Sequence, residues 1–426
     1  MEKPSCSGRK VDARKIERPS ASRMNPQPNL TGPVEVFPID RLEALDAESR
    51  ATRARTEQLI ELAKKGLPQM FAHGAFVHTV REVKTASGRS VRPEGDSLRY
   101  AANVASGLAF VDEAVQRHIL EGATAADLAL NCARRAEKSK DPGAVALCAW
   151  AAAEVADVYA TPLLKRLTAL LESEETIATV DCSWTLIAAL AARHLGDTEH
   201  LTTLAANRLM GGQGATGLFP HMLPAVSNGR LRAHIGCFAD QVYSTQGLAR
   251  LSVAKNDPTA LAAAEASGGR IAHLQGPAGQ WWWHYDTRDG SVVEGYPVYS
   301  VHQHAMGPMA LLDLREAGGT DHMKSVAKGL RWLDEHPEVD VPMVSEEDGV
   351  IWRKVARREP KKAVRAISAL TTGLKRGFHL PGLDIMFPPS RVDYECRPYE
   401  LGWMLYAWLS GGVVERLRNS AVRGGR

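Results

Sequence analysis

The residues best suited to chemistry gather in one short stretch, between Gln280 and His304. Aromatic rings stack on the apolar faces of sugar rings, while carboxylates and imidazoles bind hydroxyl groups and transfer protons. This mixture suits a polyhydroxylated ligand, so the sequence predicts a binding site here. Its members are Trp281, Trp282, Trp283, His284, Tyr285, Asp286, Glu294, Tyr296, Tyr299, His302 and His304. Trp282 is expected to be structural, because alternating residues of one strand cannot all face one pocket.

Two carboxyl groups are needed to cleave a glycosidic bond, one to protonate the leaving oxygen and one to attack or activate water. Glu294 is predicted to be the general acid, because it ends a strand just before a long helix. Asp240 starts an earlier helix and is predicted to be the base, with an ordinary N-cap as its structural alternative. Asp286 and Glu400 are further carboxylates, and Glu400 could also simply pair with a helix dipole.

The same cluster suits a second mechanism, removal of the proton beside a uronate carboxylate. Tyr299 or His302 would then be the catalytic base. Arg99 would hold the substrate carboxylate, unless it forms an ordinary ion pair between helices. The residues leave open whether the reaction is hydrolysis, epimerisation or elimination.

Polar and aromatic residues mark the starts of five predicted helices, at residues 98–100, 181–184, 238–243, 296–304 and 397–400. An N-cap requires only one Ser, Thr, Asp or Asn, so capping does not explain the Tyr and His residues. We therefore expect these helix starts to line a shared substrate site. The predicted substrate contacts are Arg99, Tyr100, Gln241, Tyr243, Trp281, Trp283, His284, Asp286, Tyr296, His304, Tyr399 and Glu400.

The sequence predicts no metal and no cofactor. His302 and His304 are two residues apart, whereas one helical face needs a spacing of four. A zinc site combining one of them with Cys237 and Asp240 is the weaker alternative. Gly211 to Gly214 are not followed by the Lys-Ser/Thr of a P-loop, and neither a dinucleotide fingerprint nor a Gly-x-Ser-x-Gly elbow occurs.

Composition narrows the class of protein further. The 426 residues are 44% hydrophobic, which is enough for a large core. Fifty-two basic and 49 acidic residues leave a net charge of +3, which gives no argument for nucleic-acid binding. No apolar run approaches the roughly 18–20 residues of a membrane span. Six scattered cysteines without a Cys-x-x-Cys pair predict reduced thiols and a cytoplasmic location.

Apolar residues at spacings of three and four predict a chain of helices between two unstructured ends. We expect a tail and entry segment over 1–40, one helical domain over 41–412 and a tail over 413–426, with Met1 or Met24 as the start. Helices are predicted at 51–66, 97–117, 124–138, 143–158, 161–173, 180–195, 198–210, 238–254, 258–274, 298–316, 321–335, 360–373 and 398–411. So many helices of this length favour a ring of helix pairs over a four-helix bundle.

An internal repeat with a period of 62 residues supports this view. Residues 214–221 resemble 276–284, and Asp240-Gln241 falls on His302-Gln303. Two β-hairpins are predicted in the loops, at 281–294 and 344–353, because each has Asp-Gly between β-prone runs.

Paired helices in a closed ring, Trp-rich loops and polar helix starts resemble the (α/α)6 toroids of the six-hairpin glycosidase-like superfamily. The resemblance covers about residues 45–412. It implies an all-α toroid with small β-hairpins, and a carbohydrate-active enzyme of the hydrolase, epimerase or lyase type whose partner is a glycan. The alternatives are a terpene or prenyl cyclase-like enzyme, to which Gly279-Gln-Trp281 gives a faint likeness without the Asp-Asp motifs, and a non-catalytic glycan-binding protein. The oligomeric state is left open.

Overall fold

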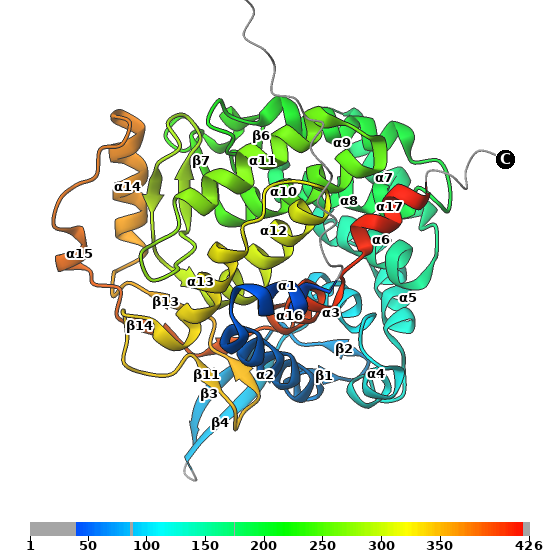
Figure 1. Cartoon of the computed structure of the whole chain (residues 1–426), viewed down its shortest axis with the longest axis horizontal. Coiled ribbons are helices and arrows are strands. Elements are labelled where there is room, and N and C mark those ends of the chain that lie inside the picture. The colour runs from blue at the N-terminus through cyan, green and yellow to red at the C-terminus, as the bar shows by residue number, and fades with distance from the viewer. Residues whose placement is uncertain (1–39, 86–87, 174, 421–426) are drawn as a thin grey trace, which may run out of the picture. The chain divides into compact units, whose positions relative to one another are not determined.

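The computed structural model describes residues 40–85, 88–173 and 175–420 (Figure 1). Almost all of the predicted N-terminal tail therefore lies outside the described residues. Contacts along the chain separate Met1–Val36 from a compact unit, Phe37–Arg426, and everything below concerns this second unit. Among its described helices, none combines the length and the apolar character needed to cross a membrane.

Six helices form a closed inner ring in which each helix contacts the next and the last contacts the first. Nearly all residues of these helices are buried, which explains their apolar, Ala-rich composition. The π-helix η3 (His302–Met306) continues into the inner helix that starts at Gly307. The segment 298–316, predicted to be helical throughout, begins with a short strand at Val298–Tyr299. The inner helices are α3 (Leu98–Leu108), α6 (Pro142–Ala156), α8 (Thr179–Ala192), α10 (Phe238–Lys255), α12 (Gly307–Glu316) and α16 (Pro398–Leu409).

Six outer helices cover this ring, each packed against an inner helix or η3. They are α2 (Arg50–Gly66), α5 (Ala125–Ala136), α7 (Thr161–Glu172), α9 (Glu199–Gly212), α11 (Pro258–His273) and α13 (Met323–Glu335). Inner and outer helices alternate along the chain, so the predicted (α/α)6 toroid is confirmed. The remaining helices are α1 (Arg41–Glu48), α4 (Glu113–Ile119), α14 (Ala363–Leu374), α15 (Leu383–Met386) and α17 (Val413–Ser420), with 3-10 turns η1 (Pro68–Met70) and η2 (Ala225–Asn228).

Two of these helices differ from the sequence expectations. The single helix predicted over 97–117 is two helices, α3 and α4, because the chain turns at residues 109–112. Part of the predicted C-terminal tail forms α17, which buries Val413, Val414 and Leu417 against the ring near α10 and α12. Burial of this apolar face explains why the segment is ordered into a helix.

Short strands occupy the connections that lead into inner helices. Both predicted hairpins are confirmed, as β8–β9 and β11–β12, but among their Asp-Gly residues only Gly290 and Gly349 have positive φ. The sheets are β1 (Phe71–Ala72) with β2 (Ala75–Phe76); β15 (Glu395–Cys396) with β3 (Thr79–Thr85) and β4 (Gly88–Glu94); β5 (Ile177–Ala178) with β6 (Met222–Leu223); β7 (Ile235–Cys237) with β8 (His284–Asp286) and β9 (Val292–Glu294); β10 (Val298–Tyr299) with β13 (Lys354–Ala356) and β14 (Arg391–Asp393); and β11 (Val344–Ser345) with β12 (Val350–Ile351).

The 62-residue repeat has the same hydrogen bonds in both copies. The Gln213 amide donates to the carbonyl of Gly217 at 2.8 Å, and the Gln275 amide donates to the carbonyl of Gly279 at 3.1 Å. Both glycines have positive φ, +86° and +99°. A Cβ on Gly279 would lie 2.2 Å from the carbonyl oxygen of Lys328, so this turn packs against the next outer helix only with glycine. The repeated unit is thus a Gly-rich turn that leads from an outer to an inner helix.

The C-terminal ends of the inner helices meet around a buried ionic network. Asp313 of α12 accepts hydrogen bonds from Arg41 at 2.5 Å and from Arg250 at 2.7 Å, and all three side chains are almost fully buried. Arg250 also donates to the Tyr406 hydroxyl at 2.7 Å. The two guanidinium groups hold the pKa of Asp313 below its ordinary value although burial alone would raise it. The side chains at this end of the ring are buried and paired with one another, so we look for a ligand site at the opposite end.

Candidate functional site

The opposite end of the ring gathers side chains from the starts of the inner helices. In four of these helices the third residue is polar, and a side chain in the first turn points back toward the N-terminal end. These residues are Tyr100 of α3, Asp181 of α8, Asp240 of α10 and Glu400 of α16. We call them, and the side chains linked to them directly or through one another by the contacts below, the ring-end cluster.

Asp181 differs from the other acids of the cluster because capping does not use its carboxylate. Its one ion pair among the described residues is with Arg99, at 3.3 Å, and Arg99 also binds Asp141, the N-cap of α6. Burial, together with the charges of Asp141 and Asp240, raises the pKa of Asp181 to about 6, although the charge of Arg99 lowers it. Asp181 therefore keeps its proton up to about pH 6, well above the range of an ordinary aspartate, as suits a general acid.

Asp240 is fully buried and its two oxygens differ. Oδ2 accepts from the backbone N–H of Cys237 at 2.6 Å and lies 3.1 Å from Nδ1 of His221. Oδ1 has no hydrogen-bond partner among the described residues. The hydrogen bond with Asp240 raises the pKa of His221, whose side chain is 46% exposed. The N-cap of α10 is Cys237, so Asp240 is not the N-cap that the sequence offered as an alternative but the capping-box residue three positions later, with one buried oxygen left without a partner.

Aromatic rings and arginines form the wall beside these acids. Trp283 stacks on His302, with ring centroids 5.9 Å apart and planes at 11°, and lies 4.8 Å from Tyr299. The guanidinium of Arg365 lies 5.4 Å from the centre of the Trp283 ring, and that of Arg353 lies 5.2 Å from the Tyr299 ring. No ion pair of Arg365 is found among the described residues. Its charge is therefore available to a bound acidic group.

On the far side of the cluster, α3 and α16 bring their first turns together. Tyr100 stacks on Tyr399 with centroids 4.6 Å apart, and its hydroxyl accepts from Arg397 at 2.7 Å. Glu400 is 1% exposed and accepts from the backbone N–H of Arg397 at 3.2 Å, as a capping-box residue. Burial raises the pKa of Glu400 to about 7 although Arg353 lies 3.7 Å away.

Two further predicted contacts have mixed surroundings. The hydroxyl of Tyr243 accepts from Trp403 at 2.8 Å, and its ring packs edge-on against Trp184. His284 is 5% exposed, its Nδ1 has no hydrogen-bond partner among the described residues, and burial lowers its pKa. Both side chains belong to the ring-end cluster, but neither is free at the surface.

Glu294, the predicted acid, is not in contact with Asp240. Strand register aligns Cys237 of β7 with His284 of β8 and His284 with Glu294 of β9. Two strand spacings put the Cα atoms of Cys237 and Glu294 about 10 Å apart. Glu294 instead accepts two hydrogen bonds from Arg357, at 3.0 and 3.1 Å, and burial raises its pKa. Its catalytic role stays a prediction that this geometry does not support.

Other predicted contacts fall outside the cluster. Asp286 is fully buried and forms an ion pair with Arg288 at 2.6 Å, at the far end of β8. The Tyr296 hydroxyl donates to Glu338 at 3.0 Å. Three residues lie in the core: Trp281 stacks on Phe238, Gln241 bonds both backbone groups of Phe219, and His304 is fully buried. Burial lowers the pKa of both His302 and His304 to about 3, so both imidazoles are neutral.

Three residues of the cluster were absent from the predicted site. Asp181 stood in a polar helix start, but nothing in the sequence distinguishes it from a capping residue. His221 ends the first copy of the Gly-rich repeat, where the second copy ends in His284, and this equivalence was a usable signal. Arg365 belongs to a charged segment whose position on Trp283 has no sequence signature.

One group in the described part of the chain could hold a metal ion. His221, Cys237 and Asp240 each offer a ligand atom, and these atoms all lie within 4.8 Å of one another. Cysteine, histidine and carboxylate are zinc ligands, and three protein ligands with an open position are typical of a catalytic zinc site. Burial keeps the pKa of the Cys237 thiol well above its ordinary value, and metal binding would have to displace its proton.

Comparisons with known proteins identify the architecture. The sequence matches no protein-family model and no curated protein. Among solved structures, an unsaturated glucuronyl hydrolase specific for heparin is 12% identical, with a TM-score of 0.53, over 85% of this chain and 97% of that one. An unsaturated glucuronyl hydrolase from Streptococcus agalactiae is 10% identical, with a TM-score of 0.51, over 89% and 97%. At such identities the likeness concerns the fold alone, and it agrees with the ring of six helix pairs described above.

Proposed function

We propose that the protein is a glycoside hydrolase in which Asp181 is the general acid and Asp240 the general base. The observation that carries this proposal is the contrast between two buried carboxylates at the same position of neighbouring inner helices. Burial raises the pKa of Asp181 to about 6, whereas Asp240 accepts two hydrogen bonds on one oxygen. A buried carboxyl group with a raised pKa beside a second carboxyl group that is held by hydrogen bonds is typical of an acid–base pair.

The reaction follows from these positions. Asp181 would donate its proton to the glycosidic oxygen as the bond to the anomeric carbon breaks. A water molecule held by Oδ1 of Asp240 would add its oxygen to that carbon and pass a proton to the carboxylate. The Cys237 N–H and His221 keep Asp240 in place, and Arg99 holds Asp181 through its ion pair. Half-exposed His221 gives solvent a route to the pair.

An acidic oligosaccharide is the substrate that we favour. The two structural neighbours above are named for unsaturated glucuronyl groups, and one of them for heparin. In this chain Arg365 is a cation above the Trp283 ring, an arrangement that can stack a sugar and bind its carboxylate together. We also propose a cytoplasmic location, which cell fractionation would test.

Release of reducing ends from unsaturated glycosaminoglycan disaccharides and from neutral oligosaccharides tests the proposal. We expect Asp181→Asn and Asp240→Asn to lower kcat by about 10²–10⁴-fold. Glu294→Gln is the matched control, since Glu294 is a buried carboxylate outside the cluster. Loss of turnover in Glu294→Gln with full turnover in Asp181→Asn would reverse the assignment.

Proton abstraction from a uronate is less well supported. Burial raises the pKa of Tyr299, which opposes ionisation at neutral pH, and His302 is stacked between Phe238 and Trp283. Elimination would create a new double bond and epimerisation no new reducing end, so analysis of the products separates both from hydrolysis.

Zinc-dependent hydrolysis is the second candidate, favoured by the ligand atoms of His221, Cys237 and Asp240. It predicts that zinc restores activity to protein treated with a chelator, and that Cys237→Ser loses both the metal and the activity. The acid–base proposal predicts instead that chelator and Cys237→Ser leave turnover within a fewfold of the parent.

A further inference from the structure

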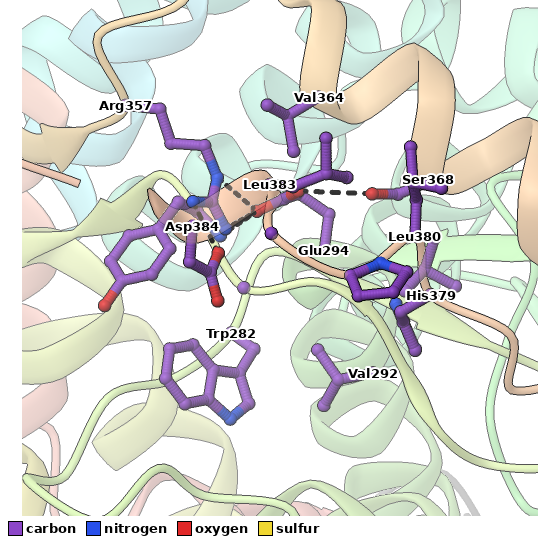
Figure 2. Close-up of a pocket in the computed structure, with 15 residues that line it drawn as sticks. Trp282, Val292, Glu294, Arg357, Val364, Ser368, His379, Leu380, Leu383 and Asp384 are labelled. Carbon is purple, nitrogen blue, oxygen red and sulfur yellow. Dashed lines mark hydrogen bonds and ion pairs between the residues drawn. The ribbon is translucent and has the colours of Figure 1, made fainter. Parts of the chain in front are cut away.

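A cavity lies outside the ring-end cluster, between the β8–β9 hairpin and the segment 357–384 (Figure 2). Its volume is about 500 Å³, within the range of small-molecule sites. Helix α14 forms one wall and packs on β9, beside the β7–β8–β9 sheet at the edge of the ring (Figure 1). We propose that this cavity is a second carbohydrate-binding site, non-catalytic and selective for neutral sugar residues.

Two consecutive tryptophans connect the cavity to the ring-end cluster. Trp282 and Trp283 come just before strand β8, and their side chains contact different groups. Trp283 contacts Tyr299 and His302 of the cluster, whereas Trp282 lines the cavity. A sugar bound on Trp282 would therefore occupy a different site from the glycan in the proposed active site.

One side of the cavity offers an aromatic and aliphatic surface. Figure 2 shows Trp282 and Val292 on this side, facing the polar residues across the opening. Trp282 is half-buried, and Tyr296 supports it edge-on with ring centroids 5.8 Å apart. An indole fixed from behind by a second ring is suited to stack on the apolar face of a pyranose.

The opposite side carries fixed hydrogen-bonding groups. Arg357 binds Glu294 through Nε and Nη2 at 3.1 and 3.0 Å and binds Asp384 through Nη1 at 2.7 Å. Asp384 has a side chain 79% exposed, so its carboxylate can accept from sugar hydroxyls. Ser368 donates to Oε2 of Glu294 over a long 3.4 Å, a contact that a ligand hydroxyl could replace. Ligand-binding sites combine such a few placed polar groups with an apolar wall.

Charge indicates which sugars would bind. Two carboxylates, Glu294 and Asp384, face one guanidinium, Arg357, and the imidazole of His379 and the phenol of Tyr296 also line the wall. An acidic sugar would place its own carboxylate beside Asp384, where like charges repel. Neutral sugar residues avoid this repulsion, so we expect the cavity to bind neutral sugars. The ring-end cluster, where Arg365 lies above Trp283, is expected to bind acidic ones.

Calorimetric titration of the full chain carrying Asp181→Asn, with cellotriose, maltotriose and mannotriose as probes, tests the proposal without turnover. We expect at least one probe to bind, and we expect Trp282→Ala and Asp384→Ala each to raise its Kd by about tenfold or more. Trp282→Phe, which keeps a ring, should lose less. Ile385→Ala is the matched control, because Ile385 adjoins Asp384, is 89% exposed and does not line the cavity.

The proposal is overturned if none of the three probes binds, or if binding survives both Trp282→Ala and Asp384→Ala. Because Asp384 is exposed, its substitution is compatible with folding even if Trp282→Ala is not, and thermal unfolding of each variant checks this. The inference rests only in part on the proposed function. Parent protein that hydrolyses no glycan, yet binds a neutral probe through Trp282, would refute the hydrolase proposal and keep the second site.

Discussion

Replacing Asp181 with asparagine should inactivate the protein and yet stabilise it. Asp181 is 8% exposed, and burial raises its pKa from an ordinary value of 3.8 to about 6. The unfolded chain ionises this group near pH 4, while the folded chain holds the proton until about pH 6. Folding stability therefore falls as pH rises through this window, because the folded state binds the extra proton. By pH 8 the difference amounts to about 3 kcal/mol.

An uncharged asparagine of the same shape avoids this penalty. We expect Asp181→Asn to be more stable than the parent by up to about 3 kcal/mol at pH 8 and by about half of that at pH 5. Urea unfolding at the two pH values measures both differences. Arg99 keeps its ion pair with Asp141 in this variant, so no cation is left buried and unpaired.

Asp141→Asn is the matched control for the sign of the effect. Burial alone would raise the pKa of Asp141, but its hydrogen bonds and the charge of Arg99 lower this pKa below its ordinary value. The ionised form of Asp141 therefore stabilises the fold. This variant should be less stable than the parent at pH 8. An Asp181→Asn protein that is no more stable than the parent at pH 8, or whose gain does not grow with pH, would refute the reasoning about Asp181.

Three further outcomes follow from the same structure. Asp313→Asn should lose up to about 3–5 kcal/mol of unfolding free energy, because Arg41 and Arg250 each lose one of their two buried carboxylate partners; a parent-like urea midpoint would contradict this. Gly279→Ala should lose at least about 2 kcal/mol, since its φ is +99° and its Cβ would meet the Lys328 carbonyl, whereas Gly269→Ala, in an open helical position, should be neutral or slightly stabilising in the same assay. Turnover should fall about tenfold for each pH unit above about 6, where Asp181 loses its proton, and a profile flat to pH 8 would exclude Asp181 as the acid.

Local patterns in the sequence were sufficient to predict the ring. Apolar spacing located the inner and outer helices, and Asp-Gly located two hairpins, because both signals depend on a few neighbouring residues. The β3–β4 hairpin was missed, since both strands are rich in polar and charged residues, β4 is mostly exposed, and neither strand has a regular alternating apolar pattern. Helix α1 was also missed. Its buried Arg41 pairs with Asp313, about 270 positions away, and no local pattern in the sequence indicates such a contact.

The site was predicted less completely, because it depends on which side chains face one another across the ring. Strand alternation predicted that Trp282 would not share a pocket with Trp281 and Trp283, and Trp282 lines the cavity beside α14 while Trp283 lies in the ring-end cluster. Trp281 and Trp283 were both predicted to contact substrate, but Trp281 lies in the core. Asp240 was predicted as a catalytic residue, but its predicted partner was Glu294, on β9. The structure offers Asp181 instead. That Asp181 pairs with Arg99 and does not cap its helix can be seen only from its contacts.

The central claim is that Asp181 and Asp240 act on the two sides of one glycosidic bond. A crystal structure of the Asp181→Asn protein with an unsaturated glycosaminoglycan disaccharide tests it most directly. We expect the glycosidic oxygen within about 3.2 Å of the residue-181 amide, with a water or the anomeric carbon next to Oδ1 of Asp240. A disaccharide bound only against Trp282, or with its glycosidic bond away from both side chains, would contradict the account.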